Sequence, residues 1–195
     1  MVDTIIRDPS NAYAQKVTSD GRGKVTCIST SVCHSTNHEY KEFYTAYFSQ
    51  SPTANNDCVF FIKNQSSDYD LVIPKLKMNV DGAVEVYAKI GDVGTPNAGT
   101  TITPINWNSS GTNACDAIIE YGADLDNAGA SLSGGSEFYR WIFSAANYDG
   151  ANTTEFELRA QAVITQNKGF SLWVSDSART LRCHVLFNFH RSDSH

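Results

Sequence analysis

The sequence predicts an all-β protein built from antiparallel strands, and three observations lead to that prediction. Residues 181–190 are apolar at alternate positions, with Val185 on one face and His184 on the other, which is the period of a half-buried strand. Similar runs recur from residue 58 onward at spacings of about ten residues, with turn residues between them, as expected of sandwiches and barrels. Charged residues make up only 18% of the chain, a composition that suits a turn-rich β protein.

The first 57 residues differ from the rest and are expected to form an N-terminal arm, leaving residues 58–195 as the β domain. Turn-forming clusters separate two strand-like segments in the arm, 25–32 and 40–48. The second segment is compatible with a strand or a short helix, and its aromatic residues favour a strand. One or two short strands are therefore predicted in residues 1–57.

From residue 58 the expected strands follow one another with clear turn signals. Asp81 and Gly82 lie between two alternating runs, and they predict a hairpin because glycine supplies the positive φ of a tight reversal. Pro74 lies inside the second run and has no N–H for a ladder, so that strand is expected to be at an edge or bulged. The expected strands are 58–64, 71–80, 83–91, 101–107, 115–121, 138–145, 156–164, 170–174 and 181–190.

Two long loops, 92–99 and 122–135, interrupt this pattern. Long loops in compact domains are often functional. The second loop is rich enough in Gly and Ser to need a neighbouring surface for its order. We expect both loops at the interfaces or the outer tip of an assembly.

The charge balance bears on the partners of the chain. Fifteen basic and twenty-one acidic residues give a net charge of −6, which argues against nucleic acid, because phosphate binding needs concentrated Lys and Arg. Between residues 111 and 157 the only basic residue is Arg140, so this stretch predicts either a face for a basic partner or a solvated acidic surface. No apolar run approaches the length of a membrane span, and a soluble protein is expected.

The cysteines are odd in number and scattered, and the start of the chain lacks a secretory signal, so free thiols in a reducing cell are expected. Cys33, His34 and His38, with Cys27, are zinc-binding residue types, but their spacing is not that of a common finger or ribbon. Polar loop residues are the preferred interpretation. The five cysteines are Cys27, Cys33, Cys58, Cys115 and Cys183.

The segment from Asp124 through Asp126 to Gly129 resembles the start of a calcium loop, because hard cations prefer several oxygens around a sharp turn. However, Ala128 has no side-chain oxygen, and no Glu follows at the required distance. An acidic loop is the preferred interpretation. The sequence therefore assigns no metal ligand and no cofactor-binding residue.

Catalytic patterns are equally weak. The chain has no Gly-x-Ser-x-Gly elbow, and the carboxylate pairs Asp116 with Glu120 and Glu137 with Glu155 would suit glycoside cleavage only if the fold brought them together. A chain with twenty-one acidic residues offers such pairs by chance. No catalytic residue is assigned, and the protein is expected not to be an enzyme.

The tryptophans suggest a binding role as an alternative. Trp107 lies in a polar segment and is expected to be exposed, where its face could stack on a sugar ring near the acidic loops. Trp141 and Trp173 lie inside expected strands and are predicted to belong to the core or to a subunit interface.

Several segments resemble small virion proteins that decorate or cement the heads of tailed bacteriophages. The resemblance consists of a polar N-terminal arm with Gly-Arg-Gly-Lys-Val-Thr at 21–26, followed by Val-Phe-Phe-Ile-Lys-Asn at 59–64, Gly-Thr-Thr-Ile-Thr-Pro-Ile-Asn at 99–106 and Lys-Gly-Phe-Ser-Leu-Trp-Val at 168–174. It implies a jelly-roll-like β-sandwich at 58–195 with an extended N-terminal arm at 1–57. It also implies a homotrimer bound to the major capsid protein on the capsid surface of the virion.

The function expected from the sequence is therefore that of a noncatalytic capsid decoration or cement protein with neither nucleic acid nor membrane as a partner. One alternative is a carbohydrate-binding module or a phage fibre tip that recognises a host glycan through Trp107. A further alternative, a glycan-cleaving enzyme, would need one of the carboxylate pairs.

Overall fold

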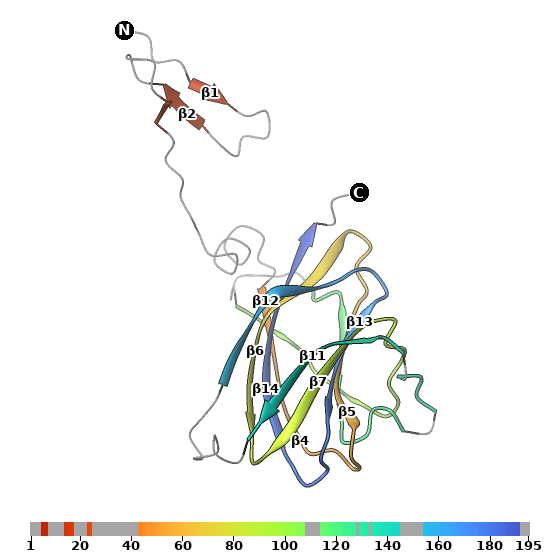
Figure 1. Ribbon diagram of the computed structural model, residues 1–195. Coiled ribbons are helices and arrows are strands. Elements are labelled where there is room, and N and C mark those ends of the chain that lie inside the picture. The colour runs from red at the N-terminus through yellow and green to blue at the C-terminus, as the bar shows by residue number, and fades with distance from the viewer. Residues whose placement is uncertain are drawn as a thin grey trace. The chain divides into compact units, whose positions relative to one another are not determined.

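The computed structural model describes residues 5–7, 14–17, 23–24, 43–107, 114–127, 129–132, 134–144 and 154–191. The chain divides into two compact units, Met1–Val32 and Cys33–His195. Every regular element of the described residues is a strand. The larger unit contains two antiparallel sheets of five and six strands (Figure 1), so the predicted all-β sandwich is confirmed. None of the described residues belongs to a helix that is long and apolar enough to cross a membrane.

The smaller unit contains three short strands in a sheet of its own. They are antiparallel and lie in sequence order. The predicted strand at 25–32 lies outside the described residues. The three strands are β1 (Ile5–Arg7), β2 (Ala14–Val17) and β3 (Gly23–Lys24).

The five-stranded sheet includes β4, a strand that the sequence analysis grouped with the N-terminal arm. β4 lies inside this sheet between β14 and β9 and buries Phe43, Tyr44 and Phe48. The larger unit thus begins at Cys33, earlier than the boundary expected from composition. In spatial order the strands are β12 (Thr154–Ile164), β6 (Tyr69–Val80), β14 (Leu181–Arg191), β4 (Phe43–Gln50) and β9 (Ile105–Asn106).

The six-stranded sheet forms the second layer. Its central strands β13 and β5 are buried along almost their whole length, whereas β11 and β8 lie at the edges. In spatial order the strands are β11 (Ser136–Phe143), β7 (Val84–Gly91), β13 (Gly169–Val174), β5 (Asp57–Asn64), β10 (Ala117–Tyr121) and β8 (Thr100–Thr101).

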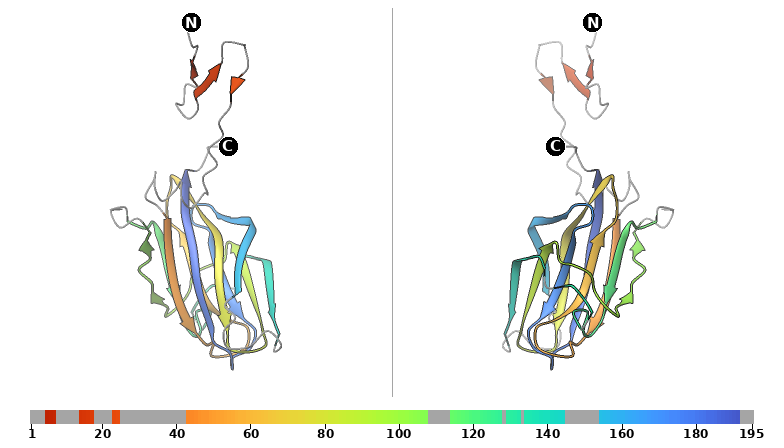
Figure 2. Two further views of the ribbon diagram at one scale, coloured as in Figure 1. Left: turned by 90° about the vertical axis from the view of Figure 1, so that its left-hand side faces the viewer. Right: turned by 90° about the vertical axis from the view of Figure 1, so that its right-hand side faces the viewer.

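Successive strands alternate between the two layers from β4 to β7 and again from β11 to β14, as the two side views in Figure 2 help to follow. The hairpin predicted at Asp81 and Gly82 is therefore wrong, because β6 and β7 belong to different sheets. The Asp81 carboxylate accepts the N–H of Thr180 at 2.9 Å. This hydrogen bond joins the β6–β7 connection to the β13–β14 connection. An alternating run with a Gly turn is compatible with either a hairpin or a crossing, and the sequence pattern does not distinguish them.

The expected strand at 101–107 is also divided between the layers. β8 pairs with β10 in the six-stranded sheet, whereas β9 pairs with β4 in the other. Pro104 lies between the two short strands. Proline cannot donate to a ladder, and the chain changes sheets at this point.

Pro74 lies at an irregularity in β6 and not at a sheet edge. β6 pairs with β14 on one side and β12 on the other, which excludes the edge position. The ladder with β12 shifts register between the pair at Lys75 and the pair at Ile73, and Pro74 falls between them. The predicted alternative, a bulge, is confirmed.

The main core fills the space between the sheets with aliphatic and aromatic side chains. Phe48 of one sheet stacks on Phe60 of the other with ring centroids 4.9 Å apart, and Tyr44 stacks on Phe187 at 5.5 Å. Each fully buried side chain of this size stabilises the fold by roughly 1.5–3 kcal/mol relative to an exposed one. The inward-facing side chains that alternate along the strands of both sheets therefore supply most of the stabilisation of the fold.

A second apolar cluster lies on the outer face of the six-stranded sheet. The connections β7–β8 and β10–β11 join strands near opposite edges of this sheet, so residues 92–99 and 122–135 cross its outer face. The two loops bind each other, since the N–H of Asn97 donates to the carbonyl oxygen of Leu125 at 3.0 Å. The cluster consists of Cys58, Phe61, Tyr87, Val93, Leu125, Leu132 and Trp173.

The surface that orders the second long loop is therefore the chain's own sheet. Leu125 and Leu132 are buried against it, at 0% and 1% exposure. The proposed location of both loops at assembly interfaces stays a prediction.

Candidate functional site

The outer face of the five-stranded sheet carries a groove of about 370 Å³. It is formed by side chains that point away from the main core on three adjacent strands, and by the residue that follows β9. The lining residues are Thr45, Lys75, Lys77, Trp107, His184 and Leu186.

The strand register explains why these side chains meet. In one row across the sheet Thr45 of β4 is opposite Leu186 of β14, and Leu186 is opposite Lys75 of β6. Directly opposite side chains on antiparallel strands lie about 4.5–5.5 Å apart. A second row, two residues along each strand, consists of Tyr47, His184 and Lys77.

Trp107 closes one end of the groove and is held from behind. Its backbone N–H donates to the carbonyl oxygen of Phe43 at 2.8 Å, and its ring meets the buried ring of Phe43 edge to face, with centroids 5.2 Å apart. The indole is nevertheless 54% exposed. Trp107 is therefore a fixed aromatic surface that faces solvent.

His184 lies at the centre of the second row. Its ring is 4.6 Å from the ring of Tyr47, centroid to centroid, with the planes tilted by 42°. Partial burial, and then the positive charge of Lys77, lower the pKa of His184 below its usual value of 6.5. The imidazole is therefore neutral at neutral pH, with one nitrogen that donates and one that accepts a hydrogen bond.

The two lysines do not make the groove a simple cationic site. In the ladder with β12, Lys75 is opposite Glu157 and Lys77 is opposite Glu155. Neither Lys75 nor Lys77 is a free cation, because each interacts with another group of the protein. The groove is thus an aromatic and hydrogen-bonding surface more than an electrostatic one.

A group of three carboxylates lies at the other side of the sandwich. Oxygen atoms of Asp57, Asp124 and Asp126 lie within 4.8 Å of one another. Asp57 accepts the N–H of Ala54 at 2.5 Å, and Asp126 accepts the N–H of Cys58 at 2.7 Å. Two of the three carboxylates therefore act structurally: Asp57 closes the turn before β5, and Asp126 joins the start of β5 to the loop at 122–135.

Asp124 is the third carboxylate of this group. Burial, and then the charges of Asp57 and Asp126, raise the pKa of the Asp124 carboxyl. Sequence reasoning considered Asp124 and Asp126 as a calcium loop but missed Asp57. Asp57 lies far away along the chain and enters the group only because β5 and this loop pack together.

The structure does not bring the two expected carboxylate pairs together as a catalytic dyad would require. Glu137 lies on β11 and Glu155 on β12, in different sheets, and Glu137 forms an ion pair with Arg140 at 2.7 Å. Asp116 and Glu120 are four residues apart on or next to β10, which in extended chain is about 13 Å. That separation exceeds the roughly 5–9.5 Å of glycosidase carboxylates.

The thiols within the described residues are free, as predicted. Cys58 and Cys183 are buried, and burial raises the pKa of both thiols. Burial likewise raises the pKa of Cys115 to about 12. These thiols are therefore protonated side chains with low reactivity. The other two cysteines, and the candidate zinc ligands with them, lie outside the described residues.

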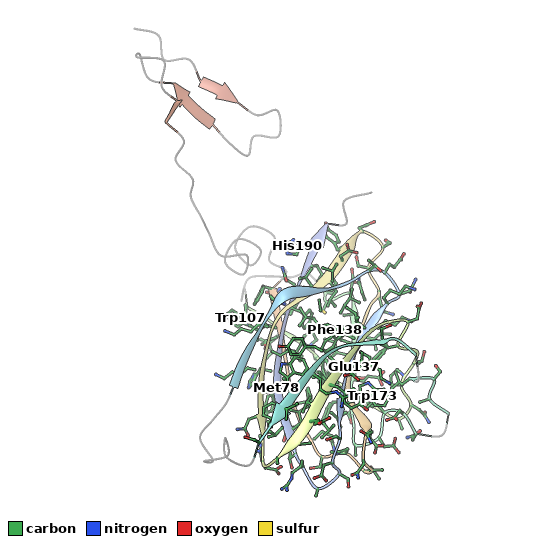
Figure 3. The ribbon with its side chains drawn as sticks, viewed as in Figure 1. Met78, Trp107, Glu137, Phe138, Trp173 and His190 are labelled. Atoms are coloured by element: carbon green, nitrogen blue, oxygen red, sulfur yellow. The ribbon has the colours of Figure 1, made fainter. Side chains whose placement is uncertain are left out.

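The predictions for the three tryptophans are confirmed. Trp107 is 54% exposed, whereas Trp141 and Trp173 are 4% and 5% exposed, and Figure 3 shows Trp107 and Trp173 at opposite sides of the sandwich. The neighbours of Trp107 are different from those expected, because it lines the groove with Thr45, His184, Leu186 and two lysines instead of the acidic loops. Alternation in the sequence indicates which residues of β4, β6 and β14 point outward. Only the strand order brings those residues together.

Comparison with known proteins gives no match. No family model fits the sequence, and no curated protein or solved structure is significantly similar to the chain. The function must therefore be inferred from the residues and their arrangement.

Proposed function

We propose that this chain is a noncatalytic structural protein that decorates the head of a tailed bacteriophage, where it binds the major capsid protein and stabilises the shell. The observation that carries the proposal is the separate unit at Met1–Val32. Chains below about 40 residues rarely bury enough surface to fold alone. Its strands are also very short, so a partner surface is the natural source of its stability.

The strand order supports a jelly-roll topology for the sandwich. β4 is hydrogen-bonded to β14, β5 to β13, β6 to β12 and β7 to β11. This is the pairing expected when a long antiparallel ribbon folds over to make two Greek keys. The resemblance to head decoration proteins also implies a jelly-roll topology.

Self-assembly is part of the proposal, with a homotrimer as the expected state. β11 lies at the edge of the six-stranded sheet, and it exposes Ile142 at 73% and Tyr139 at 49%. Long edge strands with exposed apolar side chains favour pairing with another chain. Light scattering should give three times the 21.4 kDa mass of one chain, and Ile142→Asp should lower it. A monomeric wild-type protein would contradict this part of the proposal.

The main test is the amount of the protein in purified particles of the encoding phage. Quantitative mass spectrometry should find hundreds of copies per virion if the protein coats the head. A handful of copies would point to a tail component instead. Absence from the particles would refute the proposal.

A second test addresses the N-terminal unit. Heads assembled without the protein are mixed with the full chain or with a chain lacking residues 1–32, and bound protein is measured after sedimentation. The full chain should bind, and the shortened chain should not. Equal melting of the sandwich in both chains is the control, and equal binding would show that the unit has no role in attachment.

A further inference from the structure

Exposed apolar side chains gather around the groove on the five-stranded sheet. Within the described residues six large hydrophobic side chains are exposed, and three of them lie on β4 or at β9: Tyr47 at 50%, Ile105 at 68% and Trp107 at 54%. Single exposed hydrophobic residues are normal on protein surfaces, whereas a cluster marks an interaction site. This cluster borders a hollow that is large enough for a ligand.

We propose that this groove binds a pyranose ring of a glycan, with Trp107 as the stacking surface. The proposal is independent of head decoration, which does not require it. A sugar ring presents an apolar face of C–H groups and a rim of hydroxyl groups. The groove presents the matching features, an exposed indole face and polar side chains around it.

The indole is positioned before any ligand arrives. The backbone hydrogen bond to Phe43 and the edge-to-face contact with its ring restrict Trp107 from behind. A side chain that is already ordered loses little conformational entropy on binding, so more of the stacking energy appears as affinity.

The polar side chains supply both kinds of hydrogen-bonding group. Thr45 has a hydroxyl that donates and accepts, and the neutral imidazole of His184 has one nitrogen of each kind. Lys75 and Lys77 add ammonium groups at the far side of the groove. Sugar hydroxyls also donate and accept, so they suit this set better than a purely anionic ligand would.

The size and charge of the groove limit the ligand further. A volume of about 370 Å³ is near the lower end of the roughly 300–1,000 Å³ of small-molecule sites, which leaves room for one or two sugar rings. Lys75 and Lys77 each interact already with another group of the protein. Stacking and hydrogen bonds, and not net charge, are therefore expected to select the ligand.

The experiment is binding of the full-length protein to a printed array of bacterial and plant glycans. At least one glycan should be retained. Its soluble form should then change the tryptophan fluorescence, a signal that reports Trp107 because Trp141 and Trp173 are buried. Retention of no glycan on the array would overturn the proposal.

Substitutions identify the groove as the site. Trp107→Ala should weaken binding by about tenfold or more, as for other aromatic hot spots, whereas Trp107→Phe should restore part of the affinity. Val163→Ala is the matched control, because Val163 is a similarly exposed apolar residue of the same sheet that does not line the groove. Unchanged binding in Trp107→Ala, with the fold intact by circular dichroism, would place the ligand elsewhere and reject the proposal.

Ionic strength separates stacking from charge attraction. Binding should change by less than about twofold between low and physiological salt, because surface charges are screened over that range and stacking is not. If only uronate-containing glycans bind and salt abolishes their binding, the groove is an anion site and the proposal is wrong. Neither result affects the copy number in particles, so the glycan site and the decoration role are tested separately.

Discussion

The two outer faces of the sandwich differ in what covers them, although both are made of strands with the same alternation. On the six-stranded sheet Trp173 is 5% exposed beneath two loops, and the ammonium of Lys89 lies 3.8 Å from its ring centroid. On the five-stranded sheet Trp107 is 54% exposed beside a groove. The same residue type is thus structural on one face and available for binding on the other.

The difference arises from the connections between strands. From β4 to β14, every connection to the five-stranded sheet comes from the other sheet. The six-stranded sheet instead has two connections between its own strands, β7–β8 and β10–β11, and each passes from one side of the sheet to the other. Loop path, and not strand pattern, therefore decides which face becomes a second core.

The sharpest test of this contrast is to remove each tryptophan. Trp173→Ala should lower the free energy of unfolding by about 3–5 kcal/mol, the range for a buried aromatic side chain. Trp107→Ala should cost only about 1 kcal/mol, since it loses little more than the contact with Phe43. Urea denaturation of both variants measures the two values. Equal losses would show that the two faces do not differ in their contribution to stability.

A glycine in the covering loops gives the next largest effect. Gly94 has a φ of +92°, and a Cβ there would overlap the carbonyl oxygen of Ser131 in the other loop. Gly94→Ala should therefore separate the loops and cost about 3 kcal/mol.

Gly91 is the matched control for Gly94. It has a φ of +104°, but a Cβ there would meet nothing within 4 Å. Gly91→Ala should cost only about 1 kcal/mol of backbone strain. Thermal melting compares the two variants, and a larger loss in Gly91→Ala would show that strain, and not loop contact, dominates.

The sequence predicted the strands better than their connections. Alternation locates most strands within a few residues, because burial on one face imposes that period wherever a strand lies. It cannot show whether Asp81 and Gly82 turn back within one sheet or cross to the other, because both paths leave the same local pattern. The path of residues 122–135 over Phe61 and Trp173 was missed for the same reason.

The candidate site, too, could be predicted from the sequence only in part. The exposure of Trp107 follows from its polar neighbours in the sequence. Thr45 and His184, which line the same groove, lie on strands that are adjacent only in the folded sheet, and strand order depends on contacts between distant segments. Asp57 joins Asp124 and Asp126 in the same way.

Asp124, in the loop that crosses the six-stranded sheet, provides a test with a smaller expected effect. Its pKa is raised in the folded protein, so the folded state holds this proton more tightly than the unfolded state, and stability is lost as pH rises through the folded-state pKa. Asp124→Asn should therefore stabilise the protein at neutral pH by a few tenths of a kcal/mol, the range of screened surface charges. At about pH 3.5, where the carboxyl is mostly protonated, the gain should vanish. Urea midpoints of the wild type and the variant at the two pH values test this prediction. A loss of stability in the variant at neutral pH would mean that the Asp124 charge stabilises the fold.

His184, on the outer face of the five-stranded sheet, provides the smallest expected effect. Its contribution to stability changes with pH in the opposite direction to that of Asp124. Its pKa is lowered by partial burial and by Lys77 of β6, while Tyr47 of β4 covers its other side. The unfolded chain therefore binds the proton more readily, and the stability present above about pH 6.5 falls as pH drops through the folded-state pKa. His184→Gln should remove this slope, so that wild type and variant differ less at about pH 7.5 than at about pH 5. Because the imidazole is mostly exposed, solvent screening keeps the change small. A steeper acid loss in the variant would mean that the charged imidazole is stabilised in the groove, and the groove would then favour anions over neutral sugars.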